Sequence, residues 1–231
     1  MFHRNITRIK AVANALEELK EKVVFVGGAT ISLYPDQPVL ETRPTDDVDV
    51  IIEILNYKER IELEEKLHAI GFTNDIQSGI VCRYRINGII VDIMPTNDPS
   101  IGFHNKWYPD GFKNAIWHTV DPTCIIQILS APHFIATKFE AFKGRGKSDG
   151  RTSHDFEDII YVLENRSTIW EEMNSAELEL KKYIHSEFTD LLRNPHHAEW
   201  IECHTSPGSP PATNHILTEI LRFAQPLNGQ K

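Results

Sequence analysis

The stretch TDDVDV, residues 45–50, places two carboxylates two positions apart at the start of an apolar segment that continues to Leu55. Side chains two apart along a β-strand point to the same face, so Asp47 and Asp49 are expected to lie side by side. Two adjacent carboxylates repel each other, and a divalent cation is the usual way to stabilise such a pair. Oxygen ligands of this kind suit Mg²⁺ or Mn²⁺. The stretch therefore predicts a strand over 48–55 with a metal site at its beginning.

A third carboxylate, Asp92, lies inside the apolar run IIVDIM, residues 89–94. The dipeptide Asn87-Gly88 just before this run favours a type I′ turn, so a β-hairpin is predicted over 80–95. A buried aspartate needs a partner. If the hairpin lies beside the 48–55 strand, Asp92 joins Asp47 and Asp49. Three carboxylates can then hold one or two Mg²⁺ ions, and these ions can bind a triphosphate.

A glycine pair follows the first predicted strand. VVFV, residues 23–26, is a short β-branched run, and Gly27-Gly28 after it indicates a tight turn. Such a turn lets backbone N–H groups approach phosphate oxygens closely. Thr30 and Ser32 add hydroxyl donors at the same place, so we expect the turn and these hydroxyls to bind phosphates.

The rest of the chain predicts an α/β half followed by a helical half. In the first half, the pattern indicates helices over 5–21 and 57–70, an irregular segment over 96–120 with a short helix around 111–117, and a strand over 125–129. In the second half it indicates helices over 131–143, 153–165, 174–193 and 215–224. We therefore expect an α+β fold with a mixed sheet and flanking helices over 1–129, and a helical domain over 130–231.

Composition narrows the function classes. The chain has 231 residues, 41% of them hydrophobic and 25% charged, as in ordinary globular proteins. No apolar run approaches the roughly 20 residues that span a bilayer, and the N-terminus lacks the apolar region of a secretory signal. The three cysteines are far apart and give no disulfide framework, so we expect a cytoplasmic protein with no membrane partner. A net charge of −9 argues against a general nucleic-acid binder.

One part of this acidic chain is basic. Lys138, Lys143, Arg145, Lys147 and Arg151 form a local cluster in the helical half. Basic groups are expected near a triphosphate because they neutralise its developing charge. We therefore expect the basic cluster and the acidic site to take part in binding the same triphosphate.

The pattern Gly27-Gly28, then Asp47-Val48-Asp49, then Asp92 resembles the nucleotidyltransferase superfamily with a DNA polymerase beta-like palm. The resemblance implies that the glycine turn holds an NTP and that the three aspartates carry the metal ions. It also implies that the third aspartate helps to deprotonate the attacking hydroxyl. The implied activity is metal-dependent transfer of a nucleoside monophosphate from an NTP to an acceptor, with release of pyrophosphate. Gly28 and Asp47 are nineteen positions apart, more than is usual in the superfamily, and the loop 35–46 accounts for the difference.

The second half is similar to the AbiEii/AbiGii toxin nucleotidyltransferases through KFEAFKGRG at 138–146 and SHDFED at 153–158. In that family a helical lysine approaches the nucleotide phosphates and a later aspartate lies near the site. The resemblance assigns these roles to Lys138 and Asp155, with Asp158 as an additional acidic position, and implies that the helical domain completes the active site. It further implies a toxin of a toxin–antitoxin system, with tRNA or another RNA as acceptor and a cognate antitoxin as partner.

Two other functions stay open. One is nucleotidyl transfer to a small molecule such as an aminoglycoside, because an acidic pocket would suit a polycationic acceptor. The five basic residues in 138–151 favour RNA over such an acceptor. The other is a non-catalytic NTP-binding module, which the intact glycine turn and the three aspartates disfavour.

Overall fold

The computed structural model describes residues 4–36, 42–97, 105–145, 149–206 and 210–226. The chain forms two compact units, each described here by itself. Among the described residues, the first unit takes the chain up to Leu33 and from 42 to Ser130. The second unit takes 34–36 and the chain from Ala131 onward.

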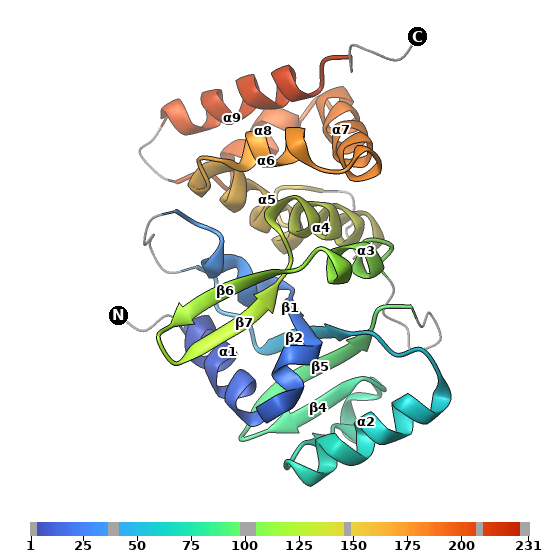
Figure 1. Cartoon of the computed structure of the whole chain (residues 1–231). Coiled ribbons are helices and arrows are strands. Elements are labelled where there is room, and N and C mark those ends of the chain that lie inside the picture. Colours follow the sequence, from blue (N-terminus) through green and yellow to red (C-terminus); the bar gives the residue numbers. More distant parts are fainter. Residues whose placement is uncertain (1–3, 37–41, 98–104, 146–148, 207–209, 227–231) are drawn as a thin grey trace. The chain divides into compact units, whose positions relative to one another are not determined.

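The first unit is built on a mixed sheet (Figure 1). Within the described ranges the sheet has seven strands in the order β3-β4-β5-β2-β1-β7-β6. Neighbours are antiparallel except for the pairs β2–β5 and β1–β7, which are parallel. The strands are β1 (Val23–Val26), β2 (Asp47–Ile52), β3 (Thr73–Asn74), β4 (Arg83–Ile86), β5 (Ile89–Pro95), β6 (Ile116–Asp121) and β7 (Cys124–Ile128). The mixed sheet confirms the predicted fold class for this half of the chain.

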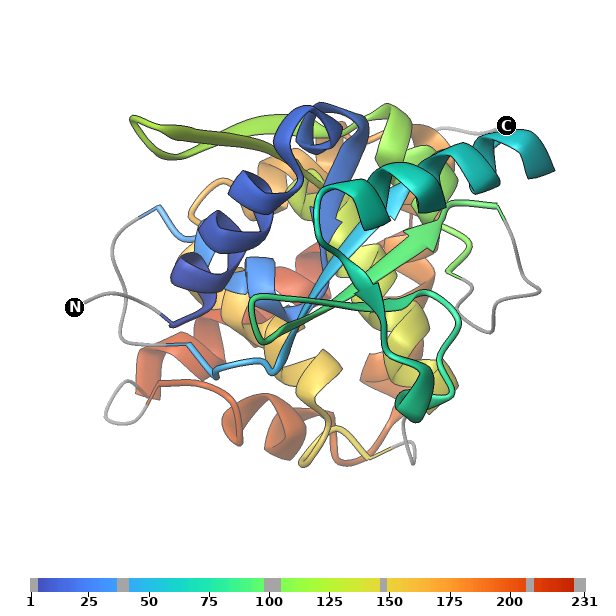
Figure 2. The ribbon, with the colours of Figure 1, turned by 90° about the horizontal axis from the view of Figure 1, so that it is seen from below.

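Helices α1 (Arg4–Ala15) and α2 (Tyr57–Ala69) lie beside this sheet (Figure 2). α1 contacts β2, β5 and β7, and its apolar stripe, which includes Ile9 and Val12, is buried. α2 buries only Leu67 and lies over the sheet face that carries Tyr84 and Ile93. That face is opposite the one that carries Asp92, because successive side chains alternate along a strand.

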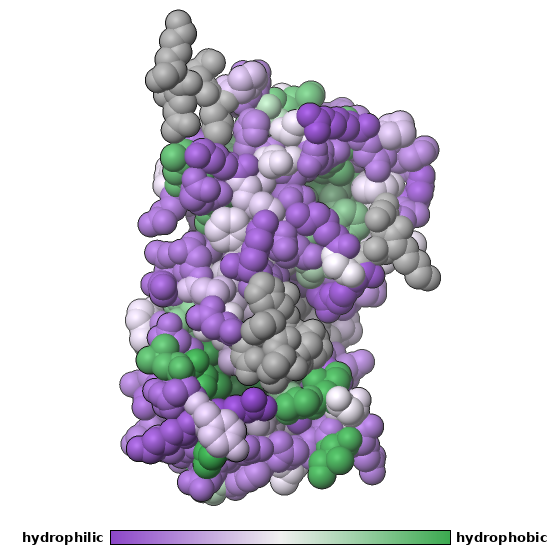
Figure 3. Space-filling view, turned by 90° about the vertical axis from the view of Figure 1, so that its right-hand side faces the viewer, coloured by the Kyte–Doolittle hydropathy of each residue, from purple (hydrophilic) through white to green (hydrophobic). Residues whose placement is uncertain are grey.

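Shorter elements connect the strands of the first unit. They are the 3₁₀-helices η1 (Glu17–Lys22), η2 (Gly28–Leu33) and η3 (Ile76–Ser78), and the short helix α3 (Tyr108–Lys113). The unit also leaves some large apolar side chains exposed, among them Leu55, Ile76 and Val81. Figure 3 shows apolar residues gathered on the lower part of one face, while the rest of that face is mainly polar.

The β-hairpin is where the sequence prediction agrees best with the structure. β4 and β5 are antiparallel, and Asn87 and Gly88 between them have φ values of 50° and 77°. Positive φ at both central residues defines the predicted type I′ turn. The hairpin also lies beside β2, as the clustering of the carboxylates requires.

Two predictions for the first unit are wrong. The helix expected over 5–21 ends at Ala15, and η1 begins at Glu17, whose left-handed φ of 49° interrupts the helix. The segment 111–117, expected as a helix, contains the end of α3 and the start of β6. β6 is an edge strand whose residues are exposed or half-buried, so it lacks the alternation of buried apolar residues that marks a strand.

The second unit is helical, as predicted. Its helices are α4 (Ala131–Arg145), α5 (His154–Asn165), α6 (Ile169–Ser175), α7 (Leu178–Arg193), α8 (His197–Glu202) and α9 (Pro210–Phe223). Ser153 caps α5 as expected, because its hydroxyl accepts a hydrogen bond from the backbone N–H of Phe156 at 3.3 Å. The helix predicted over 174–193 is the end of α6 and all of α7, and α8 was not predicted.

A piece of the loop after η2 belongs to this helical unit. The ring of Tyr34 packs on that of Phe134 with 4.5 Å between centroids, and the Tyr34 carbonyl accepts a hydrogen bond from Arg166 at 2.9 Å. Asp36 accepts another from the backbone N–H of Ser167 at 2.6 Å. None of the helices in the described ranges is long and apolar enough to cross a membrane.

Candidate active site

A row of residues across neighbouring strands positions the acidic side chains. Arg83 of β4 is in register with Asp92 of β5, and Asp92 is in register with Asp49 of β2. Asp47 precedes Asp49 by two positions and therefore points to the same face. The sheet thus holds three carboxylates and one guanidinium on one face.

The three carboxylates form a compact cluster. Asp47, Asp49 and Asp92 each offer one oxygen, and these oxygens lie within 4.8 Å of one another. Asp92 is 2% exposed, whereas Asp47 and Asp49 are half-buried and accessible from solvent. A donor set made only of carboxylate oxygens fits Mg²⁺ or Mn²⁺ better than a metal that prefers nitrogen or sulfur ligands. The structure brings together the three residues that the sequence predicted as metal ligands, and their ligand role stays a prediction.

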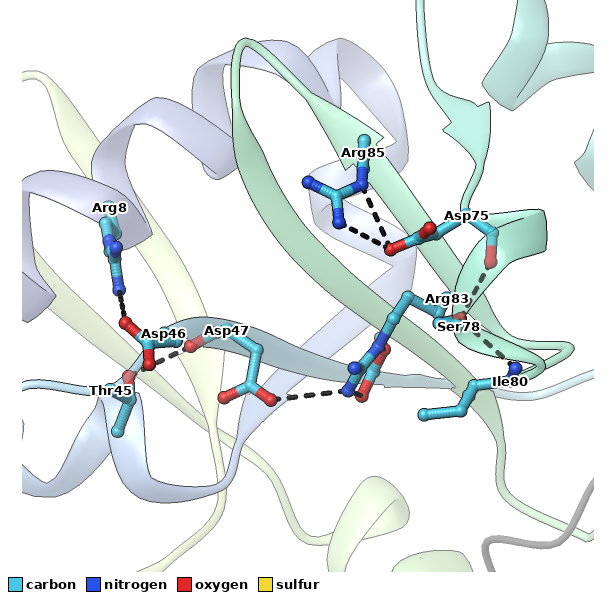
Figure 4. Close-up of polar contacts among 10 residues, drawn as sticks. Arg8, Thr45, Asp46, Asp47, Asp75, Ser78, Ile80, Arg83 and Arg85 are labelled. Atoms are coloured by element: carbon cyan, nitrogen blue, oxygen red, sulfur yellow. Dashed lines mark hydrogen bonds and ion pairs between the residues drawn. The ribbon is translucent and has the colours of Figure 1, made fainter.

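Arg83 contacts two of these carboxylates. Its Nε donates to Oδ1 of Asp92 at 2.8 Å, and its Nη2 donates to Oδ2 of Asp92 at 2.7 Å. The same Nη2 is 3.5 Å from Oδ2 of Asp47 (Figure 4). Hydrogen bonding to Asp92 raises the pKa of Arg83 above its ordinary value, so the guanidinium is a permanent positive charge at this place.

Sequence analysis missed Arg83, although a signal for it exists. A two-residue turn at Asn87 and Gly88 pairs Ile86 with Ile89, and counting outward from that pair places Arg83 opposite Asp92. A basic residue directly across from a buried aspartate is the expected partner of that aspartate.

The glycine turn meets the cluster at Asp49. Gly27 has a φ of 73°, and a Cβ atom added to it would collide with the Asp49 carboxylate. The Thr30 hydroxyl donates to the carbonyl oxygen of Gly27 at 2.9 Å, so it holds the turn closed. Gly28 begins η2, and the buried Ser32 hydroxyl oxygen has no hydrogen-bond partner among the residues that the structure describes. Of the four residues of this segment that were predicted to bind phosphates, Gly27 is the one that this geometry places directly against a carboxylate of the cluster.

The predicted site residues of the helical half form a separate network inside the second unit. Nζ of Lys138 on α4 is 3.2 Å from Oδ1 of Asp155 and 2.5 Å from Oδ2 of Asp158, both on α5. Arg145 adds a second cation, 3.1 Å from Asp155. Lys138 and Asp158 are buried. Burial opposes the charged form of Lys138, but the charges of Asp158 and Asp155 and their hydrogen bonds outweigh it, so the pKa of Lys138 is raised.

The rest of the basic cluster is also paired with carboxylates. Lys143 lies 2.6 Å from Glu187 and 3.0 Å from Glu140. Arg151 lies 3.1 Å from Asp149 and 2.7 Å from Glu199. Lys147 lies outside the described residues. Because the described cations of the cluster have acidic partners, the cluster does not favour an RNA acceptor over a small molecule, contrary to the sequence-based argument.

Comparisons with known proteins point to one family and one fold. Residues 11–223 match the family model described as "Nucleotidyl transferase AbiEii toxin, Type IV TA system". An antigenic nucleotidyltransferase-like protein from Paracoccidioides brasiliensis superposes with a TM-score of 0.50 at 16% identity, over 89% of this chain and 95% of that one. At that identity the likeness shows the fold alone. The antibiotic-resistance factor ANT(2'')-Ia gives a TM-score of 0.48 at 18% identity, over 85% of this chain and all of that one (100%). No curated protein matches the chain.

Proposed function

Because the chain belongs to the AbiEii nucleotidyl transferase toxin family and is a nucleotidyltransferase, we propose that it transfers a nucleoside monophosphate from an NTP to RNA in a metal-dependent reaction. The observation that carries the metal dependence is the cluster of three carboxylate oxygens within 4.8 Å of one another, beside the Gly27 turn. On the same family membership we propose that the protein is the toxin of a toxin–antitoxin system and has a cognate antitoxin.

The acidic cluster and the glycine turn of the first unit have different roles in this proposal. Asp47, Asp49 and Asp92 would hold the divalent ions. When bound, Mg²⁺ or Mn²⁺ polarises the α-phosphate and stabilises the pyrophosphate leaving group. The turn at Gly27 and Gly28 offers backbone N–H groups to the triphosphate, and the missing side chain at Gly27 leaves room for Asp49.

The reaction also needs a group that takes up a proton. The acceptor hydroxyl oxygen bonds to the α-phosphorus, the bond from that phosphorus to the β-phosphate bridge breaks, and pyrophosphate leaves. We assign the hydroxyl proton to the Asp92 carboxylate, which is buried and held in one orientation by Arg83. From the family resemblance, Lys138 and Asp155 of the helical unit are proposed to complete the site, with Lys138 directed to the phosphates.

The acceptor is the part of the proposal that the charge distribution supports least. We propose RNA on the family resemblance alone, because the described basic side chains of 138–151 are paired with carboxylates and give no separate support. A small-molecule acceptor is therefore the alternative that the experiment has to separate from RNA.

The experiment is transfer of label from each α-³²P-NTP, with Mg²⁺ or Mn²⁺, into total cellular RNA or into a panel of small molecules that includes aminoglycosides. Asp49→Asn removes a cluster charge without changing shape. Asp46→Asn is the matched control, because the Asp46 side chain is 92% exposed. Label in RNA that is lost with Asp49→Asn and kept with Asp46→Asn supports the proposal. Label only in small molecules overturns the RNA acceptor, and full transfer by Asp49→Asn overturns the metal site.

A further inference from the structure

We propose that Arg83 is a positioning residue that acts as a built-in counter-ion of the Asp47–Asp49–Asp92 cluster, orienting Asp92 while it weakens binding of the divalent ion before the NTP arrives. The inference rests on the metal site of the proposed function. It adds to that site a residue that contacts neither the acceptor nor the nucleotide in the proposed reaction.

The orientation part of the proposal follows from the contacts. Two hydrogen bonds, at 2.8 and 2.7 Å, join Nε and Nη2 of Arg83 to both oxygens of Asp92. A guanidinium that binds a carboxylate through two donors fixes both the position and the plane of the carboxylate. The strand register adds to this control, because Arg83 and Asp92 face each other across an antiparallel pair.

The charge part follows from the composition of the cluster. Three carboxylates have oxygens within 4.8 Å of one another, and Arg83 contacts two of the three. The nearby Arg4 and Arg8 side chains reach Asp46 instead, at 3.7 and 3.8 Å. Arg83 therefore offsets one of the three negative charges, and its formal charge does not titrate at ordinary pH.

These two contributions have opposite effects on a bound ion. A carboxylate oxygen has two acceptor positions, so Asp92 can keep its hydrogen bonds to Arg83 and still offer a lone pair to an ion. The guanidinium, however, repels a divalent cation that lies a few ångströms away. Even in a highly screened setting, repulsion at such a distance corresponds to about a tenfold change in Kd. The triphosphate brings its own negative charge. We therefore expect the divalent ion to bind more tightly once the nucleotide is present.

Mn²⁺ binding without NTP, followed by electron paramagnetic resonance on the full chain, tests the charge part directly. We expect Arg83→Gln to lower the Kd for Mn²⁺ about tenfold, and Arg83→Lys, which keeps the charge, to leave it close to that of the wild type. The matched control is Arg85→Gln, because Arg85 is also on β4 but pairs with Asp75 at 2.8 Å. This control is expected to change neither Mn²⁺ binding nor transfer.

Turnover tests the orientation part. With NTP and Mn²⁺ saturating, we expect both Arg83→Gln and Arg83→Lys to lower kcat at least tenfold, because neither side chain can hold both Asp92 oxygens. If Arg83→Gln is too unstable for titration, its melting temperature serves instead. Mn²⁺ is then expected to raise that temperature more in Arg83→Gln than in the wild type.

Different results would overturn the counter-ion role, the orientation role and the metal site. An unchanged or higher Kd in Arg83→Gln overturns the counter-ion role, and so does equal tightening by Arg83→Lys. A kcat in Arg83→Lys equal to that of the wild type overturns the orientation role. Wild-type protein that binds no Mn²⁺, or binds it as well after Asp49→Asn, overturns the metal site itself and the inference with it.

Discussion

The Asp49 carboxylate fills the space that a methyl group on Gly27 would need. Gly27→Ala therefore adds strain at a φ of 73° and also pushes Asp49 away from its place in the cluster. We expect kcat/KM for nucleotidyl transfer to fall about 100-fold, since displacing a reacting group by about 1 Å has an effect of that size. Steady-state transfer with a labelled NTP measures the loss.

Gly79 offers the matched control for this change. Its φ is 70°, and a Cβ atom there would have nothing within 4 Å. Gly79→Ala is therefore expected to lower the free energy of unfolding by about 1–2 kcal/mol through backbone strain alone and to keep its activity. Equal losses of activity in the two variants would show that the contact between Gly27 and Asp49 does not contribute to nucleotidyl transfer.

The carboxylates themselves give the second prediction. Asp47→Asn or Asp49→Asn is expected to lower kcat about 1,000-fold, because loss of a metal ligand removes several kcal/mol of transition-state stabilisation. The melting temperature measured without metal is expected to stay the same or rise, since one of three mutually repelling charges is gone. A variant that loses activity only because it unfolds would contradict this assignment, and Asp46→Asn controls for a general charge effect.

Lys138 gives a prediction that separates structure from catalysis. Lys138→Met leaves the buried Asp158 without the cation that lies 2.5 Å from it, and this is expected to lower the free energy of unfolding by about 3–5 kcal/mol. The double variant Lys138→Met/Asp158→Asn is expected to recover most of that stability but not the transfer activity. Urea unfolding and transfer assays measure the two effects. An active double variant would limit Lys138 to a structural role.

The same pair predicts a dependence of stability on pH. The pKa of Lys138 in the folded protein is raised above the ordinary value of 10.5. Its contribution to stability is therefore fully present below pH 10.5 and is lost as the pH rises through the higher folded-state pKa. Urea unfolding at about pH 8 and about pH 11.5 tests this, with the double variant as reference for other groups that titrate in this range. The stability of the wild type relative to the double variant is expected to fall at the higher pH, and a constant difference would contradict the assignment.

Local signals explain what the sequence could predict. Asn87 and Gly88 define their turn through their own backbone preferences, and a short β-branched run followed by Gly27 needs no distant partner to be recognised. The approach of Asp92 to Asp49 depends only on this hairpin lying beside β2. For these reasons the strands that carry the three carboxylates can be predicted from the sequence alone.

Contacts between distant segments explain what the sequence could not predict. Each of Lys143 and Arg151 has one acidic partner close by in the sequence. The second partners, Glu187 and Glu199, lie more than 40 positions away on α7 and α8, and the sequence gives no signal for these two contacts. Tyr34 joins the helical unit through Phe134 and Arg166, which are even more remote in sequence. Pairings of this kind arise from tertiary packing and leave no periodic pattern in the chain.

The two-residue turn at Asn87 and Gly88 also limits how the gene can change in length. Both residues are exposed, and surface turns ordinarily tolerate insertions. Here one extra codon that shifted the hairpin by a single position would turn every side chain of β4 to the opposite face of the sheet, because the strand repeat is two residues. Arg83 would leave Asp92, and Tyr84 would take its place. The register of the hairpin therefore requires a fixed length of this turn as well as a suitable composition, and a register-shifting insertion at this exposed site would separate Arg83 from Asp92.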